Sequence, residues 1–176
     1  EAAALELAGS DRIVRKLAAS PLERTQQSAR PIAGALSLEI ATDARIIEPT
    51  NAFEGLKNSG PDAAFKNPKH WLKFINPFRP SWGEPYRSIA SRMRDAMNEA
   101  WDATDGGDIV FVTHQAPIWV THLDVAGKAL FHDPRSRRCE LSSITTFERR
   151  GERWFEVDYR TPAADLVAGA KDVGAV

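Results

Sequence analysis

The chain has 176 residues, a formal net charge of −1, an apolar fraction of 43% and a charged fraction of 27%. This length predicts one domain, residues 1–176, with enough chain to enclose a hydrophobic core. A net charge near zero gives no electrostatic reason to expect nucleic acid or an anionic membrane as a partner. No apolar run approaches the length of a membrane span, and the single cysteine, Cys139, excludes an internal disulfide and favours a reducing cytoplasm.

In chain order, the apolar pattern alternates between helices and strands, which predicts a layered α/β sheet. The predicted helices cover residues 1–8 (the end of a longer helix), 21–36, 84–103 and 117–126, and the predicted strands cover 12–19, 38–41, 109–112, 143–148 and 154–159. The last two strands are joined by a short turn around Gly151, which indicates a hairpin.

The sequence SPLERTQQSA, residues 20–29, follows the first predicted strand. Ser20 can cap the next helix, Pro21 suits the first helical position and Glu23 completes an S-x-x-E capping box. Arg24 then lies in the first turn, where free backbone N–H groups and the helix dipole favour an anion such as phosphate. The alternative is a well-capped surface helix that carries an ordinary arginine.

The apolar run over residues 109–112 is typical of a strand that is buried on both faces. It ends at THQAPI, residues 113–118, where Pro117 opens the next helix. His114 is therefore expected at the carboxyl end of a parallel strand, beside the crevice in which open α/β sheets bind ligands. The alternative is a structural histidine without a catalytic role.

Residues 56–83 contain many Pro, Asn, Lys and Gly together with large aromatic side chains, among them Trp71, Phe74, Phe78 and Trp82. An insertion of this length with apolar anchors indicates a lid over a site, and the alternative is a surface excursion held in place by its aromatic residues.

Together these motifs resemble those of the histidine phosphatase, or phosphoglycerate mutase-like, superfamily. SPLERTQQSA resembles the family pattern S-P-L-x-R-[AT]-x-[EQ]-[ST]-A, and THQAPI resembles [ST]-H-G-x-P-[IV] with Gln115 in place of glycine. WGEPY, residues 82–86, is similar to the G-E-[ST]-[YFW] element with Pro85 in its third place. RIIEPTNAFEG, residues 45–55, resembles the stretch L-x-E…G-x-W-E-G and is one residue shorter. The resemblance covers about residues 20 to 160.

The resemblance implies a three-layer αβα sandwich with a mostly parallel sheet and a late antiparallel strand. The family's nucleophilic histidine lies in an Arg-His-Gly motif after the first strand, and the 176 residues contain no such motif. We therefore expect that strand and motif to precede residue 1 in a longer natural protein, and a sheet without its middle strand. The alternative is that a second molecule fills the gap, and an exposed lid or sheet edge would also favour a homodimer.

The resemblance also implies phosphoryl transfer through a phosphohistidine, without a metal or other cofactor. Arg24 would clamp the phosphate, and His114 would be the second histidine, protonated when phosphate is bound. Ser20 and Gln115 would lie beside them in the phosphate-binding set. The expected partner is a small phosphorylated substrate or a phosphate ion.

Three glutamates are candidates for the acid that protonates the leaving oxygen. Glu48 matches the family's L-x-E glutamate and is preferred, provided that partial burial or another carboxylate raises its pKa. Glu54 comes second, because its surroundings are more typical of a structural turn. For Glu84, a role as cap or first-turn charge of the next helix is preferred to a catalytic role.

The sequence thus predicts a phosphomonoester hydrolase. Residues 55–83 show no mutase substrate loop, so phosphoglycerate mutase is an alternative of lower rank. A non-catalytic phosphate-binding or scaffold module that retains Arg24 and His114 is an alternative of another class. Residues 135–138 hold three arginines that either bind an extended anionic substrate or form a solvated basic turn. His70, His122 and His132 have no spacing typical of a metal site.

Overall fold

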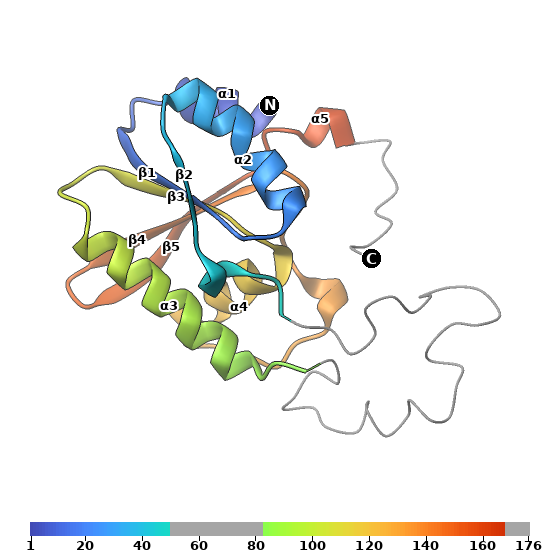
Figure 1. Ribbon diagram of the computed structural model, residues 1–176. Helices are drawn as coiled ribbons and strands as arrows, with labels where there is room; N and C mark the ends of the chain where they lie inside the picture. Colours follow the sequence, from blue (N-terminus) through green and yellow to red (C-terminus); the bar gives the residue numbers. More distant parts are fainter. Residues whose placement is uncertain (50–82, 168–176) are drawn as a thin grey trace.

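The computed structural model describes residues 1–49 and 83–167, which form an α/β structure in three layers (Figure 1). The central layer is a parallel sheet with the strand order β2–β1–β3. The strands are β1 (Val14–Ala19), β2 (Ile40–Thr42) and β3 (Asp108–Val112). Helices α1 (Ala2–Ala8) and α2 (Glu23–Leu36) cover one face, and α3 (Tyr86–Asp102) and α4 (Gln115–Val125) cover the other. The fold class expected from the sequence is confirmed.

The three parallel strands end at the same edge of the sheet. Ala19, the last residue of β1, lies opposite both Thr42 of β2 and Val112 of β3. The next residue continues this alignment, because the Ser20 N–H donates to the Val112 carbonyl at 3.0 Å. Residues that follow β1 and β3 are therefore brought together although more than 90 positions separate them in the chain.

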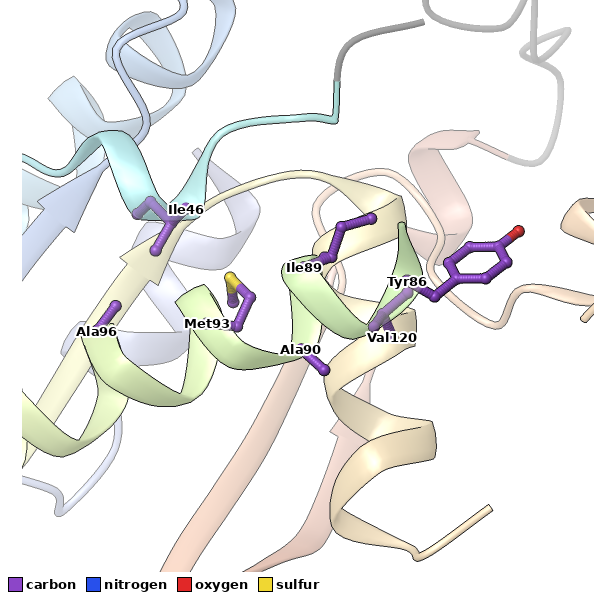
Figure 2. Packing of buried hydrophobic residues seen from close by; sticks show 7 residues of the cluster. All are labelled: Ile46, Tyr86, Ile89, Ala90, Met93, Ala96 and Val120. Atoms are coloured by element: carbon purple, nitrogen blue, oxygen red, sulfur yellow. The ribbon is translucent and has the colours of Figure 1, made fainter. Parts of the chain in front are cut away.

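The face under α3 and α4 has a compact apolar core, shown in Figure 2. Helix α3 buries residues at three- and four-residue spacing, as its sequence predicts, and they pack against α4 and a short 3₁₀ helix, η1 (Ala44–Ile46). The cluster consists of Ile46, Tyr86, Ile89, Ala90, Met93, Ala96 and Val120. Trp101, near the end of α3, lies outside this cluster: it is 42% exposed and packs edge-on against Trp154.

The opposite face is closed by α1 and α2. Ala4, Leu17 and Ile32 form its buried centre, which joins one residue from each of these helices to the middle strand. Helix α2 continues through Pro31 without a cis peptide bond. The predicted helices at 1–8 and 21–36 are thus present, with α2 beginning two residues later than expected.

A hairpin follows α4 and the 3₁₀ helix η4 (Pro134–Ser136), and the short helix α5 (Ala164–Val167) comes last. Strands β4 (Ile144–Arg150) and β5 (Arg153–Arg160) pair with each other in antiparallel fashion. Within the described residues they form a sheet of their own; the resemblance implied a mostly parallel sheet that has a late antiparallel strand and lacks its middle strand. The strand β3 accordingly has a ladder on only one side there, and its residues are half-buried rather than buried on both faces.

The turn before β3 depends on a glycine. Gly107 has φ +81°, and a Cβ placed there would lie 2.7 Å from the Ile13 carbonyl oxygen and 2.6 Å from the Arg15 Cγ. The close approach allows the Asp108 N–H to donate to that carbonyl at 2.7 Å and so to begin the pairing of β1 with β3. Among the described helices, none is long and apolar enough to span a membrane.

Candidate functional site

His114 lies where β3 ends and α4 begins, and it is one of the few buried polar residues, with 8% of its surface exposed. Its Nε2 is 2.8 Å from the Ser20 Oγ, and its Nδ1 is 3.2 Å from an Nη of Arg24. A guanidinium can only donate, so Nδ1 must accept and Nε2 must carry the proton. This structure therefore holds His114 as a neutral imidazole whose Nδ1 faces a cation.

Ser20 takes a role other than the helix cap predicted from the sequence. Helix α2 begins at Glu23, its N-cap is Leu22, and no side chain caps it. The Ser20 side chain is fully buried and accepts from His114, while its carbonyl accepts from the Thr25 hydroxyl and the Gln26 amide at 2.9 and 2.8 Å. The prediction of a capping box is thus wrong, because the hydroxyl of Ser20 binds His114, 94 residues away in the chain.

Burial, followed by the positive charges of Arg24 and Arg92, lowers the pKa of His114 to about 4. All three effects disfavour the imidazolium. Glu48 lies 3.8 Å from Nδ1 and would favour the charged form. It does not reverse the shift, because burial raises the pKa of its own carboxyl and so reduces its negative charge in acid. A protonated His114 therefore needs a further anion.

Glu48 reaches the site because η1 is tied to the end of β3. The Thr113 hydroxyl donates to the Ile46 carbonyl at 2.6 Å, which places the residues after η1 beside His114. Burial raises the pKa of Glu48, whereas Arg137, Arg24 and Arg92, in this order, and the Ala116 N–H lower it. Its Oε2 is buried without a hydrogen-bond partner in the described part of the chain. The position combines a raised pKa with a free oxygen next to His114.

Glu84 contacts the site through Arg92. Its carboxylate binds Arg92 through two hydrogen bonds of 2.9 and 3.0 Å and accepts from the Ser88 hydroxyl at 2.8 Å. It does not cap α3, whose N-cap is Pro85 without a side-chain hydrogen bond. Glu84 thus holds Arg92, and Arg92 in turn acts on the pKa values of His114 and Glu48.

The remaining predicted residues are only partly placed. Gln115 is exposed at the first position of α4, and its amide donates to the Cys139 carbonyl at 3.2 Å. Glu54 and nearly all of the predicted lid at 56–83 lie outside the described residues. The structure brings Arg24, His114, Ser20 and Glu48 together, and sequence reasoning missed Arg92, which no motif marks.

In residues 1–49 and 83–167, no group of three or more His, Cys, Asp or Glu side chains is arranged to hold a metal ion. His122 instead lies 2.5 Å from the Glu156 carboxylate and stacks on Trp119. His132 accepts a hydrogen bond from Arg137 at 2.9 Å.

The sequence matches the histidine phosphatase superfamily (branch 1) over residues 1–161. The chain belongs to this superfamily. An uncharacterized protein of Mycobacterium tuberculosis, Rv0525, is 44% identical over 164 residues, which are 93% of this chain and 81% of that protein. Membership confirms the resemblance seen in the motifs, and it supports a phosphatase- or mutase-type function.

Two solved structures show how far the fold is shared. A mycobacterial glucosyl-3-phosphoglycerate phosphatase, Rv2419c, in complex with inorganic phosphate has a TM-score of 0.69 and 20% identity, over 89% of this chain and 81% of that one. A phosphoserine phosphatase mutant from Entamoeba histolytica in complex with phosphoserine has a TM-score of 0.68 and 19% identity, and the match covers 92% of this chain and 79% of that one. At this identity the likeness establishes the histidine phosphatase fold for the described residues.

Proposed function

We propose that this protein is a phosphomonoester hydrolase in which Arg24 and His114 bind the transferred phosphoryl group. The observation that carries the proposal is the contact between these two side chains, 3.2 Å apart, at the carboxyl edge of the parallel sheet. Both positions belong to motifs of the superfamily, and the structural neighbours that bind phosphate and phosphoserine share this fold. The partner proposed for this chain is accordingly a small phosphorylated molecule.

An arriving phosphate would replace contacts that Arg24 and His114 make with each other. Its oxygens replace Nδ1 of His114 as acceptors for the Arg24 fork, which can bind two oxygens at once. Nδ1 then takes up a proton and donates to the same anion, because the negative charge offsets the effect of burial on the imidazolium. Ser20 continues to accept from Nε2 and keeps the ring in place.

Glu48 is proposed as the general acid. In the reaction of this superfamily a histidine nitrogen attacks phosphorus, the bond to the ester oxygen breaks, and water later cleaves the phosphohistidine. The leaving oxygen needs a proton, which a carboxyl with a raised pKa can hold near neutral pH. The family places the nucleophile in an Arg-His-Gly motif, which these 176 residues do not contain.

A second candidate is a phosphate-binding or scaffold module without turnover, because the contact between Arg24 and His114 would also serve binding alone. Phosphoglycerate mutase is a third, since the superfamily supports both types of reaction. The three differ in what becomes of the phosphoryl group. A hydrolase releases it to water, a mutase delivers it to another hydroxyl of a phosphoglycerate, and a binding module leaves the ester intact.

The test uses the full-length protein with phenyl phosphate as substrate and inorganic phosphate as ligand. Arg24→Gln should lower kcat/KM by about 100- to 1,000-fold, because it removes a donor to the transition-state charge. Arg30→Gln is the matched control, since Arg30 is an exposed arginine on the same helix, about 9 Å further along its axis. Equal effects of the two substitutions would refute the role of Arg24.

His114→Gln should likewise abolish most turnover and weaken phosphate binding in calorimetry. Binding that depends on Arg24 and His114 without any hydrolysis would support the binding module. For the acid, Glu48→Gln should slow an alkyl phosphate far more than 4-nitrophenyl phosphate, whose leaving group needs no proton. An equal loss with both esters would remove Glu48 from that role.

A further inference from the structure

The three arginines at residues 135–138 have different partners. Arg135 binds Asp133, and its side chain is 90% exposed. Arg138 pairs with Glu156. Arg137 is joined to no carboxylate within the described part of the chain. Among the described residues, two arginines of the cluster are therefore neutralised by a carboxylate, and the charge of Arg137 is not.

His132 fixes the direction of Arg137. The His132 Nδ1 donates to the Leu130 carbonyl at 2.8 Å, so its Nε2 carries a lone pair and accepts from the Arg137 Nε at 2.9 Å. The ring is further held against Tyr86, with ring centres 4.9 Å apart. Only Nε of Arg137 is occupied in this way, and no side-chain hydrogen bond uses its two Nη atoms in residues 1–49 and 83–167.

The segment that carries Arg137 lies against the site. The Gln115 amide, next to His114 in the chain, donates to the Cys139 carbonyl at 3.2 Å, which ties residues 137–139 to the first turn of α4. Arg137 is also the positive charge with the largest effect on the Glu48 carboxyl, ahead of Arg24. Its guanidinium is thus on the Glu48 side of the site.

We propose that Arg137 binds a second anionic group of the substrate, carried by the part that leaves with the ester oxygen. The inference rests on the proposed function, in which Glu48 protonates that oxygen, so the leaving group must lie beside Glu48. The two Nη atoms of this planar guanidinium, which make no side-chain hydrogen bond to the described residues, match the two oxygens of a carboxylate or the oxygens of a second phosphate. The substrate class is a small phosphomonoester with such a group near the ester.

The test compares two esters that differ in one charged group, phenyl phosphate and 3-carboxyphenyl phosphate, on the full-length protein. The measured quantity is the ratio of their kcat/KM values, which does not depend on how much of a variant is folded. We expect the wild type to prefer the carboxylated ester by about 10- to 100-fold, the range of a charge-assisted hydrogen-bonded pair. Arg137→Gln should bring the ratio close to one, and Arg137→Lys should keep part of it.

Arg135→Gln is the matched control, because it removes a neighbouring positive charge that is already paired with Asp133, and it should keep the wild-type ratio. A third ester, 1,3-phenylene bisphosphate, shows whether a second phosphate serves as well as a carboxylate. If the wild type cleaves the esters without preference, or if Arg137→Gln lowers both rates equally, the inference is wrong and the proposed function stands. If the wild type cleaves none of them, the proposed function itself fails.

Discussion

Protonation of His114 is expected to weaken the fold in mild acid. The unfolded chain takes up a proton at this histidine near pH 6.5, whereas the folded protein does so only near pH 4. Between these values the unfolded state binds more protons, so the free energy of unfolding decreases as the pH falls. Above pH 6.5 both states are neutral at His114, and it contributes no pH dependence there.

The difference between the two pKa values sets the size of the effect. One pKa unit corresponds to about 1.4 kcal/mol, so lowering the pH from 7 to 5 should remove about 2 kcal/mol of stability through this one residue. The full loss below pH 4 approaches about 3 kcal/mol. These values apply to the site without an anion, because a bound phosphate or sulfate would favour the imidazolium.

The assay is urea unfolding of the wild type and of His114→Gln at half-unit steps from pH 8 to pH 4, in a buffer without phosphate or sulfate. Other acidic groups titrate in both proteins and cancel in the difference. The stability of the wild type relative to the variant should fall by about 2 kcal/mol between pH 7 and pH 5. A difference that stays constant over this range would refute the burial-driven shift of His114.

Three further predictions concern stability. Gly107→Ala should lower the free energy of unfolding by more than about 2 kcal/mol, because the added Cβ would collide with the neighbouring strand. Gly106 also has a positive φ but lies in open space, so Gly106→Ala should lower it by about 1 kcal/mol. Gly34→Ala should stabilise α2 by about 1 kcal/mol, since an exposed helical position with open space gains helix propensity. Glu84→Gln should lower the free energy of unfolding by about 2 kcal/mol, because it leaves the mostly buried Arg92 without its carboxylate partner. Glu148→Gln breaks an exposed pair with Arg150 and should leave the unfolding midpoint unchanged.

Urea unfolding measures all of these changes. Equal costs at Gly106 and Gly107 would show that the strands can separate without penalty at this turn. A destabilising Gly34→Ala would mean that α2 needs the glycine for a reason other than its exposure. Equal effects of Glu84→Gln and Glu148→Gln would show that burial does not strengthen the first pair.

The positions of Arg24 and His114 could be predicted because both follow from the ends of strands. A run of β-branched and aromatic residues marks β3, its last residue fixes the edge of the sheet, and β1 ends at the same edge. Two motifs that are distant in the chain must then meet. This reasoning needs only the periodicity of each segment and the rule that parallel strands align.

Ser20 shows where local rules fail. The capping box considers partners within four residues, and the sequence offered Glu23 at the right spacing. In the folded chain the serine hydroxyl is buried and receives the Nε2 proton of His114 instead. A hydrogen bond inside the site is stronger in its dry surroundings than a cap at the solvent-exposed start of α2.

For a related reason, the sequence did not point to Arg92 and could not separate Arg137 from the two arginines beside it. An arginine is defined functionally by what its guanidinium touches, and that depends on Glu84 for one residue and on His132 for the other. The run of arginines at 135–138 allowed a solvated turn or an anion site, and within the described residues Arg135 and Arg138 pair with carboxylates whereas Arg137 does not. The strands of the hairpin were predicted, and within the described residues they pair with each other and not with the parallel sheet.

The positive charges around His114 and Glu48 explain why an anion would change the pKa values of both groups at once. Arg24 and Arg92 lower the pKa of His114, and together with Arg137 they also lower that of Glu48. A phosphate that neutralises these cations would raise both pKa values. The imidazole would become a charged donor to the phosphate, and the carboxyl would retain the proton that the leaving oxygen needs. A single binding event would therefore set both residues in the protonation states that the proposed reaction requires.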